Sequence, residues 1–316
     1  MNLELFTLSL LNGISYGLLL FLLSAGLTLI FGMMRILNLA HGSFYMLGAY
    51  LGYTSTCVLH LNFWATLLVV PCVVGLLGMA AQRYVICRVS SRGHLAELLL
   101  TYGMALLVLA IVQLVWGKAP LEYVIPQGLQ GAAFEIFGVH FPRYRAAIML
   151  IAIAALVILF IVLRLTPVGM MMRAATQNAQ MLESLGYNVP GLMTVLFGLG
   201  CALAALAGML GGFAYVTEPA MAQSMGMLLF VVVIVGGLGA LGGAFLASLF
   251  LGVLQTFLVG MDASLADIFG ISGVAYDSVL YISISQFAPL LPFVLMAMVL
   301  LVRPQGLLGE KFEVRR

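Results

Sequence analysis

The chain has 316 residues, of which 64% are hydrophobic and 8% are charged, and its formal net charge is +2. Globular proteins carry about 25% charged residues, so this composition excludes a water-soluble enzyme and indicates a protein that lies in lipid. The small net charge gives no support to nucleic-acid binding. The cysteines follow no metal-binding or disulfide spacing, and we interpret them as small buried hydrophobic residues: Cys57, Cys72, Cys87 and Cys201.

Stretches without Asp, Glu, Lys or Arg mark the candidate membrane spans, because a spanning helix needs about 20 mostly apolar residues. They predict one span each in 5–34, 98–117, 146–163, 184–217 and 278–302, two in 36–82 with a turn near His60, and two in 219–261. The last of these ranges could instead hold one span and a re-entrant piece. We therefore expect an all-α polytopic membrane protein with nine transmembrane helices, or eight, in a single domain covering residues 1–316.

Basic residues predict the orientation of the chain, because Lys and Arg gather in cytoplasmic loops. With the N-terminus outside, three basic residues fall on the outer side: Lys118, Arg143 and Arg145. Ten fall on the inner side: Arg35, Arg83, Arg88, Arg92, Arg164, Arg173, Arg303, Lys311, Arg315 and Arg316. We expect the N-terminus outside and the C-terminus in the cytoplasm. The outer loops 118–145 and 261–277 are long enough to hold short surface helices or strands.

The stretch "RILNLAHGSFYMLGAY", residues 35–50, places polar side chains in an apolar region. Such groups are costly in lipid and usually face the bundle interior or a water-filled path. Asn38 and His41 would share one face of a helix, and the neighbouring glycines would permit close packing or a local break. Two interpretations stay open. The polar residues line or gate a translocation path, or they fix helix packing; the candidates are Asn38, His41, Ser43 and Tyr45.

An inner segment, 165–190, predicts a helix outside the membrane. Pro167 and Gly169 end the preceding span, and a helix follows from Gly169 to Leu185. Gly186 is placed to form a left-handed C-terminal cap, and Pro190 prevents continuation of the helix. The helix carries small residues with a few polar groups. That composition suits docking into a groove on a partner, or an interfacial connector between two spans.

The stretch "VGGLGALGG", residues 235–243, is rich in glycine. It is not a phosphate-binding loop, because no Lys-Ser or Lys-Thr follows. Small residues let membrane helices approach closely. We expect helix packing or a subunit interface, with a role in the translocation path as the alternative, at Gly236, Gly237, Gly239, Gly242 and Gly243.

The segment "RAATQNAQMLESLGYNV" resembles the cytoplasmic coupling loop of permeases from bacterial ATP-binding-cassette (ABC) importers. Four further stretches are similar to branched-chain amino acid permeases of the leucine/isoleucine/valine type: Gly26–Tyr50, Leu99–Gly117, Val233–Gly252 and Arg303–Gly309. The resemblance covers residues from about 8 to 309. The chain departs from it in lacking an acidic residue near Gln177, and in carrying Ser43, Ala240 and Gly242.

The resemblance implies an inner-membrane permease that is not an enzyme and binds no cofactor itself. Its partners would be a second, similar permease, in a heterodimer or a homodimer, two ATPase subunits that use ATP, and a periplasmic binding protein. The cargo would be branched-chain or other hydrophobic amino acids, with urea or short amides as the alternative. Coupling to the ATPase would then involve Arg173, Ala174, Gln177, Asn178, Met181, Glu183 and Gly186.

Two other classes of membrane protein compete with this interpretation. An ion-coupled secondary transporter predicts a carboxylate in the middle of a span, whereas Glu97 and Glu218 lie near predicted span ends. A membrane enzyme predicts acids or histidines gathered at one depth. The histidines are instead scattered, which predicts no metal site: His41, His60, His94 and His140.

Overall fold

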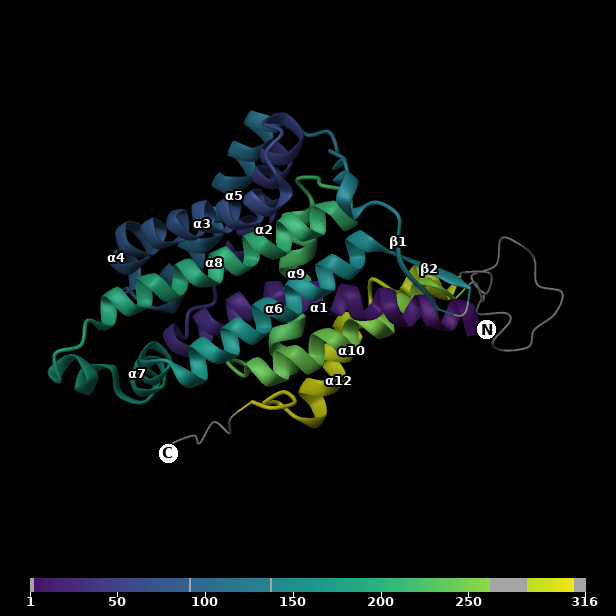
Figure 1. Cartoon of the computed structure of the whole chain (residues 1–316). Helices are drawn as coiled ribbons and strands as arrows, with labels where there is room; N and C mark the ends of the chain where they lie inside the picture. The colour runs from purple at the N-terminus through teal and green to yellow at the C-terminus, as the bar shows by residue number, and fades with distance from the viewer. Residues whose placement is uncertain (1–2, 91, 137, 262–282, 310–316) are drawn as a thin grey trace.

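The computed structural model describes residues 3–90, 92–136, 138–261 and 283–309. Their fold is almost entirely helical, as predicted. Figure 1 shows that the long helices run side by side along the length of the bundle. The helices are α1 (Leu3–Met34), α2 (His41–Tyr53), α3 (Phe63–Ala81), α4 (Cys87–Ser90), α5 (His94–Trp116), α6 (Arg143–Leu165), α7 (Pro167–Ser184), α8 (Val189–Ala214), α9 (Met221–Gly236), α10 (Leu241–Val259) and α12 (Leu291–Val302).

Six helical segments of the described chain are long and apolar enough to cross a membrane. They are α1, Phe63–Ser90, α5, α6, α8 and α10. The apolar helices α9 and α12 are shorter, and α2 has 13 residues, continued by a π-helical turn at Thr54–Val58. These three lie where further spans were predicted. The span positions therefore agree with the helices, whereas the exact total of eight or nine does not follow from helix length.

The loop 118–145 contains a 3₁₀ turn at Gln127–Leu129 and a two-stranded antiparallel hairpin, β1 (Ala132–Ile136) and β2 (Val139–Pro142). This confirms the expectation of short surface elements there. Figure 1 shows the hairpin at the same end of the bundle as the start of α1, with α4 and α7 at the opposite end. The second long loop predicted at 261–277 lies, beyond its first residue, outside the described residues.

Helix α1 forms the centre of the bundle, because it packs against both α8 and α10 and is buried without interruption from Gly17 to Ile30. Glycine makes these close contacts possible. A Cβ atom on Gly17 would lie 2.8 Å from the Leu249 Cα of α10, and one on Gly200 of α8 would lie 2.8 Å from the Gly26 carbonyl oxygen. Lipid tails are as apolar as leucine, so membrane helices gain stability from close packing rather than from leaving water.

We predict that Gly17→Ala destabilises the fold, because the added methyl group meets the backbone of α10. The expected loss is about 1–3 kcal/mol in free energy of unfolding, typical of overpacked sites. Thermal unfolding of the detergent-solubilised chain measures it. Gly103→Ala in α5 is the matched control, since no described atom beyond its own turn of helix lies within 4 Å of a Cβ there. Equal stability of the two variants would contradict the role of glycine packing.

Candidate functional site

The polar stretch after α1 is a break between two helices. Helix α1 ends at Met34, α2 begins at His41, and the backbone at Arg35 is left-handed with φ 55°. Such a φ is uncommon for a residue other than glycine and indicates local strain. Of the two possibilities named for this stretch, the local break is present: Asn38 lies in it and His41 is the first residue of α2, so these two residues do not share a helix face. The interruption leaves backbone groups that need partners.

Hydrogen bonds within the chain satisfy much of this break. Asn38 Oδ1 accepts from the Ala40 N–H at 3.0 Å, and the Asn38 carbonyl accepts from the His41 N–H at 3.2 Å. The Leu39 N–H donates to Thr101 Oγ1 of α5 at 3.3 Å, and Thr101 is fully buried. Irregular backbone at membrane depth is tolerated only where protein or cavity water satisfies it. Here the side chains of Asn38 and Thr101 provide hydrogen-bond acceptors for the backbone N–H groups of Ala40 and Leu39.

The other candidates from this stretch connect α2 to neighbouring helices. His41 Nε2 lies 3.2 Å from the Leu23 carbonyl oxygen of α1, and Ser43 Oγ donates to the Ala105 carbonyl of α5 at 3.4 Å. Tyr45 is 5% exposed, and both Asn38 and His41 are 0% exposed. Asn38 Nδ2 and His41 Nδ1 find no hydrogen-bond partner among the described residues. Between the two interpretations, this enclosed geometry favours helix packing.

Helix α7 presents one face to the bundle and the other to the surroundings. Met172, Ala175 and Leu182 are buried, in one apolar cluster with Met33 of α1 and Leu196 of α8. Every residue predicted to couple is exposed: Arg173, Ala174, Gln177, Asn178, Met181, Glu183 and Gly186. We call this set the α7 outer face. It also carries exposed apolar neighbours, because Met170 and Leu185 are 59% and 67% exposed.

The ends of α7 agree with the sequence, but its middle does not. Gly186 has φ +88°, which confirms the left-handed cap, and its N–H donates to the Glu183 carbonyl at 2.9 Å. The predicted continuous helix is wrong at Asn178, where φ −155° and ψ 94° separate two helical pieces. Asn178 Oδ1 accepts from the Met181 N–H at 3.0 Å and so caps the second piece. Pro190 lies in the first turn of α8.

The glycines of 236–243 lie at the end of α9, in the tight turn that follows it and in the first turn of α10. Gly237 and Gly239 have φ +104° and +82°, conformations that L side chains rarely adopt. A Cβ atom on Gly236 would lie 2.5 Å from the Ala244 nitrogen, and the site for one on Gly243 is occupied by the Gly236 carbonyl. Space remains only beside Gly242, where the nearest described atom is 3.6 Å away. These contacts are helix packing within one chain.

The segment 303–309 completes this turn, a role that sequence reasoning missed. The Leu307 and Leu308 N–H groups donate to the carbonyls of Val235 and Gly236 at 2.8 and 3.1 Å. These carbonyls belong to the last turn of α9, where a helix leaves acceptors without internal partners. Gly306, with φ +78°, packs against Gly237. The "RPQGLLG" string contains no periodicity that would have indicated this pairing.

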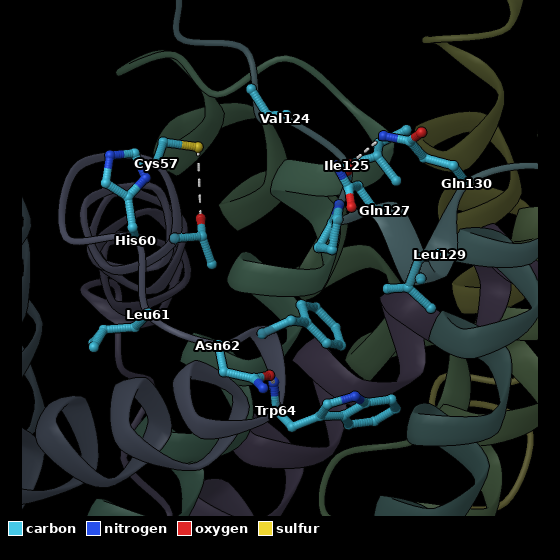
Figure 2. Close-up of a pocket in the computed structure, with 14 residues that line it drawn as sticks. Cys57, His60, Leu61, Asn62, Trp64, Val124, Ile125, Gln127, Leu129 and Gln130 are labelled. Carbon is cyan, nitrogen blue, oxygen red and sulfur yellow. Dashed lines mark hydrogen bonds between the residues drawn. The ribbon is translucent and has the colours of Figure 1, made fainter.

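A cavity of about 650 Å³ opens at the end of the bundle opposite α7. Figure 2 shows Cys57 and His60 on one side and Gln127 and Gln130 on the other. Its walls come from two chain segments, 56–64 and 124–130. Sequence reasoning missed this cavity, because the two segments carry no shared motif.

Comparisons with known proteins cover nearly the whole chain. The profile of the family described as "Branched-chain amino acid transport system / permease component" matches residues 9–302. The chain is 27% identical over 312 residues to the high-affinity branched-chain amino acid transport system permease protein LivH of Salmonella typhimurium, covering 95% of this chain and 94% of that one.

Two further similarities have comparable coverage. The corresponding permease protein BraD of Pseudomonas aeruginosa is 28% identical over 314 residues, covering 95% of each chain. Among solved structures, PsaBC from Streptococcus pneumoniae in complex with Fab matches with a TM-score of 0.48 and 10% identity, over 93% of this chain and 91% of that one.

We predict that Asn38→Leu destabilises the protein, because the Ala40 N–H loses its acceptor inside the bundle. The expected loss is about 1–2 kcal/mol in free energy of unfolding, the usual value for a lost cap or a buried hydrogen bond. Ser43→Ala is the control and should cost less, since its bond to Ala105 is 3.4 Å long. If Asn38→Leu unfolds like the wild type while changing uptake, the packing interpretation fails and the path interpretation gains support.

Proposed function

The chain belongs to the branched-chain amino acid transport permease family, and from that premise we propose how it works as the membrane subunit of an ABC importer. In this proposal the cargo is a branched-chain or other hydrophobic amino acid, delivered by a periplasmic binding protein. A second, similar permease completes the membrane part, and two ATPase subunits bind the cytoplasmic side and use ATP. The N-terminus lies outside, as the distribution of basic residues favours.

The structural observation that best supports this proposal is the exposure of the α7 outer face. This face stands at one end of the bundle (Figure 1), and it exposes apolar, polar and basic groups together. The opposite face of the same helix rests on α1 and α8 through Met172, Ala175 and Leu182. A partner that binds the α7 outer face and shifts α7 would therefore also move α1 and α8, to which α7 is packed. This geometry suits a coupling element between ATPase and membrane helices.

In this proposal, coupling means that the state of the ATPase subunits decides which of two arrangements of the membrane helices is the more stable. ATP binding and hydrolysis in the partner subunits would favour one arrangement or the other, and α7 would transmit that preference. The kink at Asn178 divides α7 into two helical pieces, so a partner can bind each piece separately. We propose that Asn38, His41, Ser43 and Tyr45 hold the break between α1 and α2 as the helices move.

We predict that Gly186→Val abolishes ATP-dependent uptake while the protein still reaches the membrane. The left-handed backbone at Gly186 is strained for a β-branched residue, so the cap and the exposed end of α7 change. Uptake of radiolabelled leucine and the membrane content of tagged protein measure this. Gly186→Asn is the control and should retain uptake, because asparagine tolerates this conformation. Full uptake by Gly186→Val would refute the coupling role.

We predict that the tagged chain co-purifies with a similar permease and two ATPase subunits in a fixed ratio. Deletion of 174–182 should lose the ATPase subunits and keep the second permease, because the deletion removes most of the α7 outer face. Gentle detergent extraction followed by mass spectrometry measures the composition. A chain that is purified alone and moves solute in liposomes without ATP would overturn the importer proposal.

A further inference from the structure

A second groove lies between α3 and α8 at the same end of the bundle as α7. Its volume is about 840 Å³, and its walls include Leu76 of α3, Val195 of α8 and the π-helical turn Gln82–Ile86. π-Helical turns inside longer helices are frequent at functional sites. No part of the proposed transport mechanism uses this groove.

The groove changes from apolar to polar along its length. Leu76 and Val195 are 61% and 46% exposed, so they give the groove an apolar flank that suits acyl chains. At the other end it is lined by Arg83, Tyr84 and Asn188. Arginine and tyrosine are typical of the boundary between hydrocarbon and headgroups.

The charges of the polar end favour an anion. Arg83 is exposed, and none of the described residues that line the groove is acidic. The groove also includes the start of α8 at Pro190 and Gly191. A helix N-terminus carries a partial positive charge that stabilises a nearby anion. The first N–H groups of α8 already have partners, so only the helix dipole contributes here.

Gln82 gives the second, independent indication of a ligand. Its side chain lines the groove and is 5% exposed, and no donor in the described part of the chain reaches its Oε1 atom. A buried acceptor without a partner costs free energy. This atom is closed off from the groove as the side chain stands, so a hydroxyl group in the groove would satisfy it after a rotation of the Gln82 amide. An anionic lipid with a glycerol headgroup offers both a phosphate for Arg83 and a hydroxyl for Gln82.

We infer that this groove binds an anionic phospholipid, with the phosphate at Arg83 and the start of α8 and with the acyl chains along Leu76 and Val195. The headgroup hydroxyl donates to Gln82 Oε1 once the amide has turned toward the groove. Basic pockets between membrane helices bind anionic headgroups through the same chemistry. The lipid fills the space between α3 and α8 beside Met34, the last residue of α1, and Ile36, which lies in the break that follows.

Native mass spectrometry of the full-length protein, with the subunits that co-purify, tests this inference. The probes are phosphatidylglycerol and phosphatidylcholine with identical acyl chains. We expect more bound phosphatidylglycerol, and Arg83→Gln should reduce its binding about fivefold, the usual effect of one basic residue near a headgroup. Arg164→Gln is the matched control, because Arg164 is exposed on α6 outside the groove, and it should leave binding unchanged.

A second variant separates the groove from general surface charge. Ala80 lines the groove and is exposed, so Ala80→Trp should fold normally and exclude the lipid by filling the space. Equal binding of the two lipids, or equal loss in the Arg83 and Arg164 variants, would overturn the inference. Displacement of phosphatidylglycerol by excess inorganic phosphate would also overturn it, because the site would then recognise a free anion rather than a lipid.

Discussion

Close contact between helix backbones is the constraint on which the rest of this structure depends. Helices in lipid gain nothing by hiding leucine from water, so they must approach until main-chain atoms touch. The crossings of α1 with α8 and α10 achieve this at Gly26, Gly200 and Gly17, and Gly48 of α2 meets Ala205 of α8 in the same manner. The large aliphatic side chains fill space around these contacts. The glycines decide where one helix can cross another.

The break after α1 is possible because of that tight centre. A non-helical stretch at membrane depth needs hydrogen-bond partners from the protein or from cavity water, and α5 approaches closely enough to supply Thr101. Asn38 supplies a second acceptor from inside the break itself. The polar residues that look anomalous in an apolar sequence therefore replace the helical hydrogen bonds that the break removes. The left-handed backbone at Arg35 begins this break, and its N–H still donates to the Phe31 carbonyl at 2.9 Å.

Much of the architecture could be predicted from local sequence signals. Charge-free stretches located the helices, and Gly186 with Pro167 bounded α7, because these residues act through their own backbone conformation. The helix break at Asn178 was missed, because asparagine as a cap depends on the partners around it. The pairing of 307–308 with α9 and the two cavities were also missed, because each joins segments that are distant in the sequence.

The pairing of Leu307 and Leu308 with the end of α9 has a consequence for biogenesis. The ribosome produces Val235 about 70 residues before Leu307, a delay of roughly 4 to 14 s at usual rates of synthesis. During that interval the last carbonyls of α9 have neither of these two partners, while α10 is already available to the insertion machinery. The turn at Gly237 is thus closed by one of the latest segments to emerge, and a nascent chain paused before it exposes two acceptors that the finished protein conceals.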